Sequence, residues 1–373
     1  MPRPLVVVLH RPAEAEAGPL TRLLATSREA LLDHQRPLFL RARVDRVLVI
    51  TDRAPSFGER LAALARELPR RRGIVVMGSG AVPLLGRTDA EALVAVASGS
   101  GHRLITNNGY SSDVCAVSDT AVLRGLPPLP TDNTLPRWLG EHRGYRVLEL
   151  PGRRRLGIDL DGPLDLALLR YHRRTPPILR AVAEVAGLDI PRITELGRVL
   201  GDRRAEVLVA GRTSATSLRW LERHARCRVR AVVEERGLRA ASELALVAPS
   251  GDGDASPPRP PVSIVGRALA SGGPATLGTL IAALADGAIL DSRVLLAHRL
   301  GGDERAWPVD EDRYASDLLR AEDIRDQWLG ALTRAARSAP VPILLGAHTL
   351  VGPGLPLVAR AARLAAGRGH GLE

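Results

Sequence analysis

Short apolar runs alternate with longer amphipathic stretches along the first 190 residues. β-Branched apolar runs predict strands at residues 4–10, 46–51, 73–78, 103–106, 145–151 and 156–160. Apolar side chains at helical spacing predict helices at residues 19–42, 57–68 and 88–99. The third helix opens with Thr88 and Glu91, which have the spacing of a capping box. This alternation predicts an α/β fold, with a mostly parallel sheet flanked by helices.

The second half of the chain predicts another α/β region. A helical segment at 175–188 comes before it. Its predicted elements are a strand at 205–211, a helix at 216–225, a strand at 227–235, a helix at 275–286, a strand at 288–298, a helix at 325–338 and a strand at 341–348. Residues 248–263 are rich in Pro, Gly, Ser and Asp, and this composition predicts a flexible loop. We therefore expect two domains, over residues 1–190 and 191–373.

The composition excludes chemistry that depends on lysine. The chain is 45% hydrophobic and 25% charged, which is ordinary for a globular protein, and its net charge is +11. All 52 basic residues are arginine, so neither Schiff-base chemistry nor the lysine of a P-loop is possible. The arginines are spread along the chain with few aromatic residues between them. We therefore expect solvated arginines and no nucleic-acid partner, although the positive charge suits nucleotide phosphates.

Cysteines and apolar runs bear on the location of the protein. Cys115 and Cys227 are the only cysteines, and their separation favours neither a disulfide framework nor a cysteine zinc site. The first apolar run is too short for a signal peptide, and no segment reaches the length of a membrane span. The expectation is a cytoplasmic protein with no membrane partner; the oligomeric state is not predicted.

Two polar stretches follow predicted strands, where ligands bind in parallel sheets. Gly78, Ser79 and Gly80 follow one strand and would let a nucleotide or its phosphates approach the backbone amides, although they also suit a tight structural turn. Asn107 and Asn108, two of the three asparagines in the chain, follow another. Their side-chain amides could read a base or a hydroxyl group, and the alternative is again a turn.

The stretch "IDLDGPLDL", residues 158–166, carries three aspartates. On the predicted strand, Asp159 and Asp161 would point to the same side of the sheet, where two carboxylates suit a Mg²⁺ ion together with substrate phosphates. Pro163 fits the first position of a helix, and Asp165 lies in its first turn. We therefore expect Asp159 and Asp161 to bind metal, and Asp165 to have a structural role.

Three segments together resemble the MobA-like nucleotidyltransferases with a GT-A-type fold (nucleotide-diphospho-sugar transferase-like), and among them the 2-phospholactate guanylyltransferases. That family has a Lys-Thr-Arg-Leu segment, a strand ending Ala-Asp-X-Pro-Leu-Leu, and an Asp-(Ile/Val)-Asp-Thr-Pro-Glu-Asp-Leu signature. The matching residues here are Thr21, Arg22 and Leu23, then Pro83, Leu84 and Leu85, then Asp159, Asp161, Pro163, Asp165 and Leu166. The resemblance covers about residues 4–170, and the last motif is its most specific part.

The resemblance implies a function. A nucleoside monophosphate would pass from a nucleoside triphosphate to a small phosphorylated or carboxylated acceptor, with release of pyrophosphate and with Mg²⁺ as cofactor. Arg22, and in addition Arg28, would serve the triphosphate, while Gly78–Gly80 and the two asparagines would bind the nucleotide. Asp161 with Asp159 would bind the metal. No catalytic residue is assigned.

Two departures from the family pattern leave alternatives open. Leu20 stands where the family has lysine, and "GSGAVPLL" lacks the aspartate that helps bind the metal in the family. Asp161 would then act with Asp159 or with another carboxylate, such as Asp113. The alternative function is a degenerate, non-catalytic protein that binds a nucleotide or phosphosugar.

The second half of the chain resembles no family that we can name, and chemistry there is a third possibility. Its polar candidates are Arg212, Thr213 and Ser214 after one strand, Asp291, Arg293 and His298 along another, Asp310, Arg313 and Asp317, and His348 after the last strand. Histidines with nearby aspartates could bind a metal or act as acid and base. Structural histidines and surface ion pairs are the alternative.

Overall fold

The computed structural model describes residues 3–51, 57–68, 72–129, 132–235 and 261–367. The chain forms two compact units and passes between them several times. Unit 1 comprises Met1–Ala17, Arg22–Asp161 and Arg174–Ala186, and unit 2 comprises Gly18–Thr21, Gly162–Arg173 and Gly187–Glu373. Most of the loop predicted at 248–263 lies outside the described residues.

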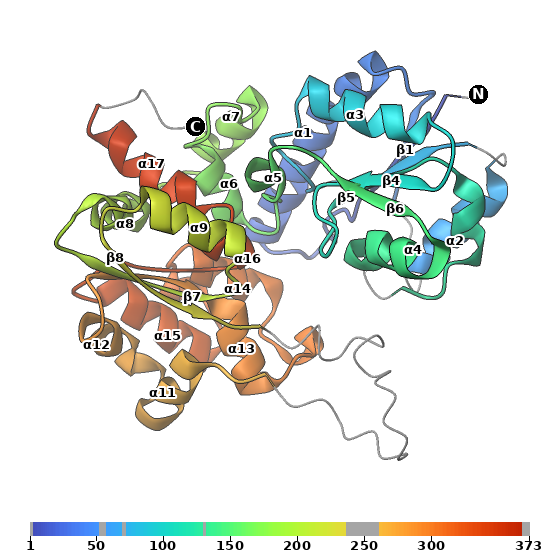
Figure 1. The fold of residues 1–373 in the computed structure, drawn as a ribbon. Helices are drawn as coiled ribbons and strands as arrows, with labels where there is room; N and C mark the ends of the chain where they lie inside the picture. Colours follow the sequence, from blue (N-terminus) through green and yellow to red (C-terminus); the bar gives the residue numbers. More distant parts are fainter. Residues whose placement is uncertain (1–2, 52–56, 69–71, 130–131, 236–260, 368–373) are drawn as a thin grey trace. The chain divides into compact units, whose positions relative to one another are not determined.

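Unit 1 is built on a six-stranded mixed sheet (Figure 1). Its strands are β1 (Leu5–Leu9), β2 (Val47–Ile50), β3 (Ile74–Gly78), β4 (Arg103–Thr106), β5 (Val114–Val117) and β6 (Arg146–Glu149). They lie in the order β2-β1-β3-β5-β4-β6. The other neighbouring pairs are parallel, and β5 runs antiparallel to both β3 and β4. The predicted α/β class is confirmed, and the sheet is mixed because β5 is antiparallel to both of its neighbours.

Helices cover both faces of this sheet because successive strand residues point to opposite sides. The helices over the sheet are α1 (Pro19–Arg41), α2 (Phe57–Glu67), α3 (Arg87–Ala97), α4 (Leu135–Arg143) and α5 (Arg153–Leu156). Unit 1 also includes α7 (Pro177–Val185). Val6 and Val8 of β1 belong to a core with α1 and α3 side chains, whereas Leu5 and Val7 belong to a core with α2 and α4. The result is three layers, with the sheet in the middle.

Unit 2 is built on a fully parallel sheet in the order β10-β9-β7-β8. Its strands are β7 (Glu206–Gly211), β8 (Arg228–Val233), β9 (Gly287–Asp291) and β10 (Ile343–Gly346). Its helices are α6 (Pro163–Leu169), α8 (Pro191–Gly201), α9 (Ala215–His224), α11 (Ile264–Gly272), α12 (Leu277–Ala282), α13 (Ser292–Leu300), α14 (Asp310–Asp317), α15 (Gln327–Ser338), α16 (His348–Val351) and α17 (Leu355–Ala365).

Three local predictions were wrong, for identifiable reasons. Residues 157–162 form no strand; Leu160 instead donates a hydrogen bond to the carbonyl of Gly80, beyond the end of β3. The strand predicted at 288–298 ends at Asp291, because this side chain accepts from the N–H of Arg293 and begins α13. Helix α3 is capped at Gly86, two residues before the expected Thr88, since the Asp89 carboxylate accepts from the Gly86 N–H.

The start of helix α6 follows the prediction. Pro163 occupies the first helical position, and the buried Asp165 carboxylate accepts a hydrogen bond of 2.8 Å from the Gly162 N–H. The structural role predicted for Asp165 is therefore confirmed.

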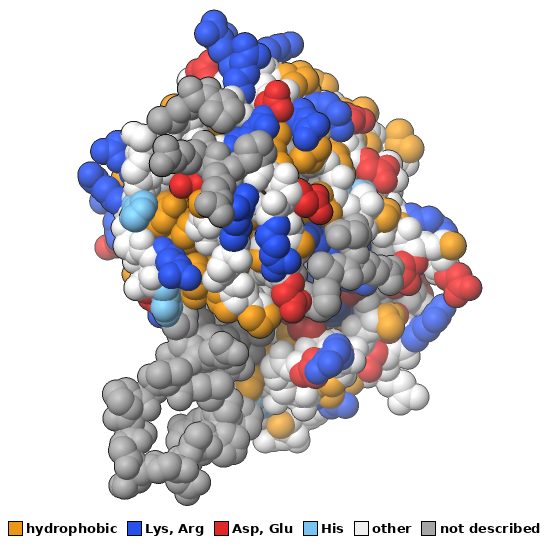
Figure 2. All heavy atoms as spheres, turned by 90° about the vertical axis from the view of Figure 1, so that its right-hand side faces the viewer, with side chains coloured by type: hydrophobic (Ala, Val, Ile, Leu, Met, Phe, Trp, Pro, Cys, Tyr) orange, Lys and Arg blue, Asp and Glu red, His pale blue; other side chains and the backbone are white. Residues whose placement is uncertain are grey.

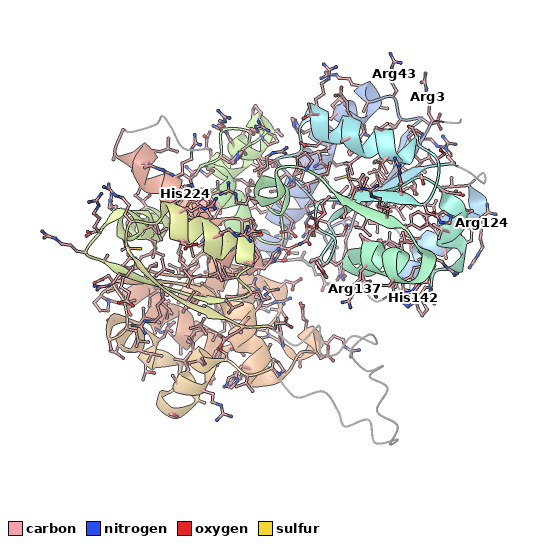
Figure 3. The ribbon with its side chains drawn as sticks, viewed as in Figure 1. Arg3, Arg43, Arg124, Arg137, His142 and His224 are labelled. Carbon is pink, nitrogen blue, oxygen red and sulfur yellow. The ribbon has the colours of Figure 1, made fainter. Side chains whose placement is uncertain are left out.

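Arginines are dispersed over the face of the molecule that Figure 2 shows. On this face, they lie among acidic and apolar side chains and form no single basic patch. In Figure 3, Arg3 and Arg43 lie near one another, and Arg124 and Arg137 lie on other parts of unit 1. Arg124 donates to the carbonyl groups of Ala65 and Leu68 near the end of α2, so it serves the fold. No helix in the described part of the chain is long and apolar enough to cross a membrane.

A close helix contact in unit 2 gives a test of the fold. A Cβ at Gly197 of α8 would collide with the Val358 carbonyl of α17, whereas Gly201, at the end of the same helix, has open space. Gly197→Ala should therefore lower the free energy of unfolding by about 1 to 3 kcal/mol. Gly201→Ala is the control and should change it by no more than about 0.5 kcal/mol. Urea titration followed by circular dichroism measures both; equal effects would contradict the packing.

Candidate functional site

The carboxyl ends of β1 and β3 in unit 1 carry a pair of buried polar side chains. His10 follows β1, Ser79 follows β3, and these strands are parallel neighbours. The Nδ1 atom of His10 is hydrogen bonded to Ser79 Oγ at 3.0 Å. The other ring nitrogen lies 3.5 Å from a carboxylate oxygen of the exposed Glu29. The pair ties the first turn beyond β3 to the end of β1.

The loop after β3 is held in a strained conformation. Val82 has a φ of 43°, in the left-handed region that a β-branched residue rarely adopts. The buried Gln35 of α1 donates from Nε2 to the carbonyls of Ala81 and Val82, at 3.0 and 3.2 Å. Strain of this kind persists only where surrounding contacts hold the backbone, and it is commonest at ligand sites. The loop at residues 78–82 is therefore fixed from outside.

Gly80 and Arg28 bind the aspartate segment to this loop. The Gly80 carbonyl accepts from the Leu160 N–H at 2.9 Å. Arg28 of α1 donates from Nε and Nη2 to the Leu160 carbonyl, at 2.9 and 2.7 Å. A Cβ at Gly80 would lie 2.8 Å from that carbonyl oxygen, so only glycine fits. Both backbone groups of Leu160 are thus bound, and the flanking aspartates have fixed positions.

Two carboxylates meet beside this contact. Asp159 and Asp161 each offer an oxygen, within 4.8 Å of each other. Asp159 is buried and Asp161 is exposed, with its carboxylate 3.7 Å from the Arg28 guanidinium. The structure brings these two predicted metal ligands together without the predicted strand. An oxygen pair of this kind suits a hard divalent cation.

The other predicted residues of the nucleotide site are placed differently. Arg22 is exposed on α1 and makes no ion pair with any residue that the structure describes. Gly78 ends β3, and a Cβ there would meet nothing within 4 Å. Ser79 is buried and bonded to His10. The predicted loop at Gly78–Gly80 is therefore adjacent to Arg28. Arg28, rather than Arg22, contacts the aspartate segment, at Leu160.

Asn107 has a structural role in unit 1. Its amide nitrogen donates to the Asp113 carboxylate and to the Leu156 carbonyl, and its oxygen accepts from the N–H groups of Asp113 and Val114. Asn108 accepts from the N–H of Tyr110, as in an Asx turn. Reading a base with Asn107 would require exchange of these bonds. Asp113 is likewise held by Asn107.

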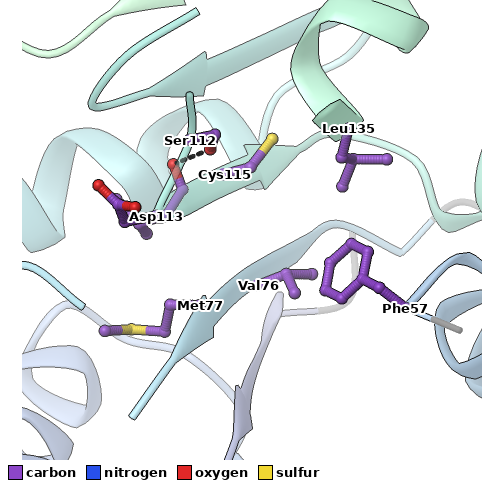
Figure 4. Close-up of a pocket in the computed structure, with 8 residues that line it drawn as sticks. Phe57, Val76, Met77, Ser112, Asp113, Cys115 and Leu135 are labelled. Atoms are coloured by element: carbon purple, nitrogen blue, oxygen red, sulfur yellow. Dashed lines mark hydrogen bonds between the residues drawn. The ribbon is translucent and has the colours of Figure 1, made fainter. Parts of the chain in front are cut away.

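A small pocket lies between β3 and β5 (Figure 4). Its lining is Phe57, Val76, Met77, Ser112, Asp113, Val114, Cys115 and Leu135. Burial raises the pKa of the Cys115 thiol to about 12, so no thiolate nucleophile is present near neutral pH. Most of the lining is apolar, and the pocket offers no chemistry of its own.

Unit 2 has a separate group of charged side chains beyond its strands. Arg212, after β7, binds the Asp291 carboxylate at the end of β9 through Nε and Nη2, at 2.5 and 3.1 Å. Arg293 binds Asp317 of α14 in the same two-bond manner. Burial acts to raise the pKa of Asp291, but the nearby cationic groups, Arg212 foremost, lower it overall. Burial raises the pKa of Asp317, and Arg293 acts against this rise.

The remaining candidates in unit 2 lie on separate elements. His298 is on α13, where its Nδ1 accepts from the Ser263 N–H, and so it follows no strand directly. His348 begins α16, just after β10. Arg313 forms ion pairs with Glu304 and Asp310. These contacts give His298 and Arg313 structural roles.

Sequence reasoning missed the contacts that hold the site together. His10, Gln35 and Glu29 were not among the predicted residues. The one available signal was position, since His10 follows β1 as Ser79 follows β3, and neighbouring parallel strands end at the same edge. No sequence pattern marks Gln35, because its partners lie 46 and 47 residues away.

Comparison with protein-family models and with curated proteins gives no match for this chain.

Burial of Cys115 predicts a loss of stability in alkali. Its pKa is raised from 9.0 to about 12 in the folded chain. The buried, protonated thiol therefore makes its full contribution to the free energy of unfolding below pH 9, and this contribution is lost as the pH rises towards 12. At pH 11 the loss from this thiol should be about 2 to 3 kcal/mol. Urea unfolding at pH 8 and pH 11 should show a smaller alkaline loss in Cys115→Ala than in wild type.

Burial also raises the pKa of Tyr145 to about 12. Its ionisation in alkali should lower the free energy of unfolding equally in wild type and in Cys115→Ala. The difference between wild type and Cys115→Ala therefore isolates the thiol. Identical alkaline losses would contradict the burial of Cys115.

Proposed function

We propose that unit 1 is a GT-A-like, MobA-like nucleotidyltransferase domain that binds a nucleoside triphosphate with Mg²⁺. The observation that carries this proposal is the approach of the Asp159 and Asp161 carboxylates, within 4.8 Å, beside Arg28. The two aspartates belong to the third matching segment of the resemblance. The loop at 78–82 directly precedes the second, Pro83–Leu85, and Arg28 is on the helix that carries the first, Thr21–Leu23. Gly80 and Arg28 both contact Leu160, between the aspartates.

The residues present fit a divalent cation. Mg²⁺ takes oxygen ligands and is usually bound by one or two protein carboxylates together with substrate phosphates. Asp159 and Asp161 would supply those carboxylates, and Leu160 between them is fixed through both of its backbone groups. When bound, the metal would neutralise charge on the phosphates of the nucleotide.

The phosphates would lie near the loop after β3. Gly78 leaves open space at the end of the strand, which suits approach of a phosphate to the backbone. Arg28 keeps a carbonyl and a carboxylate as partners, so it both orients the metal ligands and adds positive charge. Arg22, exposed on the same helix, would reach the outer phosphates.

The reaction needs little covalent chemistry from the protein. An acceptor phosphate or carboxylate oxygen attacks the α-phosphorus, the bond from that phosphorus to the bridging oxygen breaks, and pyrophosphate leaves with the electron pair. The chain's residues position the triphosphate and stabilise the charge that develops on it.

A non-catalytic binding protein is the second candidate, and one observation favours it. Residues 78–85 contain no acidic residue, and the space at Gly80 is closed by the Leu160 carbonyl and by Arg28. The domain therefore gains no metal ligand from this loop. Such a domain would bind a nucleotide or phosphosugar without turnover.

Asp161→Asn tests the metal assignment. The substitution removes the charge and keeps the shape. Calorimetric titration should show that Mg²⁺ raises nucleotide affinity in wild type and that the variant loses this gain by about tenfold or more. Asp165→Asn is the matched control from the same stretch, because its carboxylate caps helix α6. An unchanged Mg²⁺ effect in Asp161→Asn would refute the assignment.

Pyrophosphate release separates the two candidates. Wild type is incubated with each nucleoside triphosphate, Mg²⁺ and a panel of phosphorylated and carboxylated acceptors. Turnover that falls in Asp161→Asn supports the transferase. Tight Mg²⁺-dependent nucleotide binding with no pyrophosphate from any pair supports the binding protein.

A further inference from the structure

The second unit has the topology of a ligand-binding parallel sheet. Its order, β10-β9-β7-β8, places β8 on one side of β7 and β9 on the other. The connection from β7 leads to β8 on one side, and the connection from β9 leads to β10 on the other side. The two connections therefore depart in opposite directions. In open α/β sheets, ligands bind outside the carboxyl ends of the strands at this point of reversal. Gly211 and Asp291 end the two strands there.

The two strand ends are packed unusually closely. Gly211 has a φ of 132°, and a Cβ on it would collide with the Asp291 side chain. This approach allows the next residue, Arg212, to bind both oxygens of Asp291. Arg212 makes these bonds with Nε and Nη2. In a guanidinium bound side-on in this way, Nη1 and its two N–H groups point away from the carboxylate.

A buried hydroxyl group lies next in the chain. Thr213 is only 5% exposed, and its Oγ1 atom has no hydrogen-bond partner among the residues that the structure describes. A buried hydroxyl left unbonded costs about 1 to 3 kcal/mol. Thr213 directly precedes Ser214, whose side chain caps the ten-residue helix α9 by accepting from the Ser217 N–H. The hydroxyl is therefore in the loop that leads into the positive end of a helix.

We infer that Arg212, Thr213 and the N-terminus of α9 form a second ligand site, specific for a phosphate group. A phosphate oxygen would accept from the Thr213 hydroxyl and from Nη1 of Arg212, and backbone N–H groups at a helix N-terminus favour the same anion. This site lies in unit 2 and does not depend on the function proposed for unit 1.

The alternative ligand, a divalent cation, fits poorly. Both oxygens of Asp291 already accept from Arg212, and one of them also accepts from the Arg293 N–H. Asp317 gives both of its oxygens to Arg293. A metal would have to displace arginine from buried carboxylates, and this would leave the arginine charge uncompensated. The donors that remain at the site are N–H and O–H groups, which bind anions.

Thr213→Val tests this inference, because valine keeps the shape and removes the hydroxyl. Without ligand, the variant should unfold at the same temperature as wild type or slightly higher, since no bond within the described residues is lost. Calorimetric titration of the full chain with inorganic phosphate, in EDTA, should show about tenfold weaker binding in the variant. Thr333→Val is the control. Its hydroxyl is bonded to Ser316 and to the Leu329 carbonyl, so the variant should lose stability and keep phosphate affinity.

Equal phosphate affinity in wild type and Thr213→Val would overturn the inference, because the anion would then bind elsewhere. Absence of phosphate binding to wild type would overturn it as well. EDTA keeps this test separate from the Mg²⁺-dependent site of unit 1. Tighter binding of a nucleoside monophosphate or of a sugar phosphate than of inorganic phosphate, lost in Thr213→Val, would support the site and identify the source of the phosphate.

Discussion

The candidate site of unit 1 depends on the way in which Leu160 is held. Its N–H binds the Gly80 carbonyl, and its carbonyl accepts two bonds from Arg28. Hydrogen bonds from a charged donor contribute about 1.5 to 3 kcal/mol, more than neutral ones. Because Leu160 stands between Asp159 and Asp161, these bonds bring two like charges together that would otherwise separate. Their repulsion is offset by Arg28 and would be relieved further by a cation.

The surrounding loop is rigid for related reasons. Gln35 and His10 reach it from α1 and from the end of β1, and they support a backbone that Val82 would not adopt by itself. Because α1 and the end of β1 already fix this loop, it loses little conformational entropy when a ligand binds. This is the physical advantage of the strained backbone at Val82. Unit 2 shows the same principle at Gly211, where close strand packing positions Arg212.

Local sequence signals predicted local structure well. The long helix α1 and the Pro163–Asp165 helix start follow from periodicity and capping, which depend on neighbours in sequence. Strand β5 was missed because its four apolar residues lie within a polar stretch. Asp159 and Asp161 were chosen for their chemistry, but the predicted strand that was to align them does not exist. Their proximity comes from Arg28 and Gly80, which are distant in sequence, and no local pattern reveals such contacts.

The assignment of Asp159 and Asp161 as metal ligands is tested most directly by a crystal structure of the full chain with Mn²⁺ and a nucleoside triphosphate, recorded to show the anomalous signal of manganese. An anomalous peak is expected in contact with oxygens of both Asp159 and Asp161, with the phosphates beside Arg28. A nucleotide bound with its metal away from these two carboxylates would contradict the assignment.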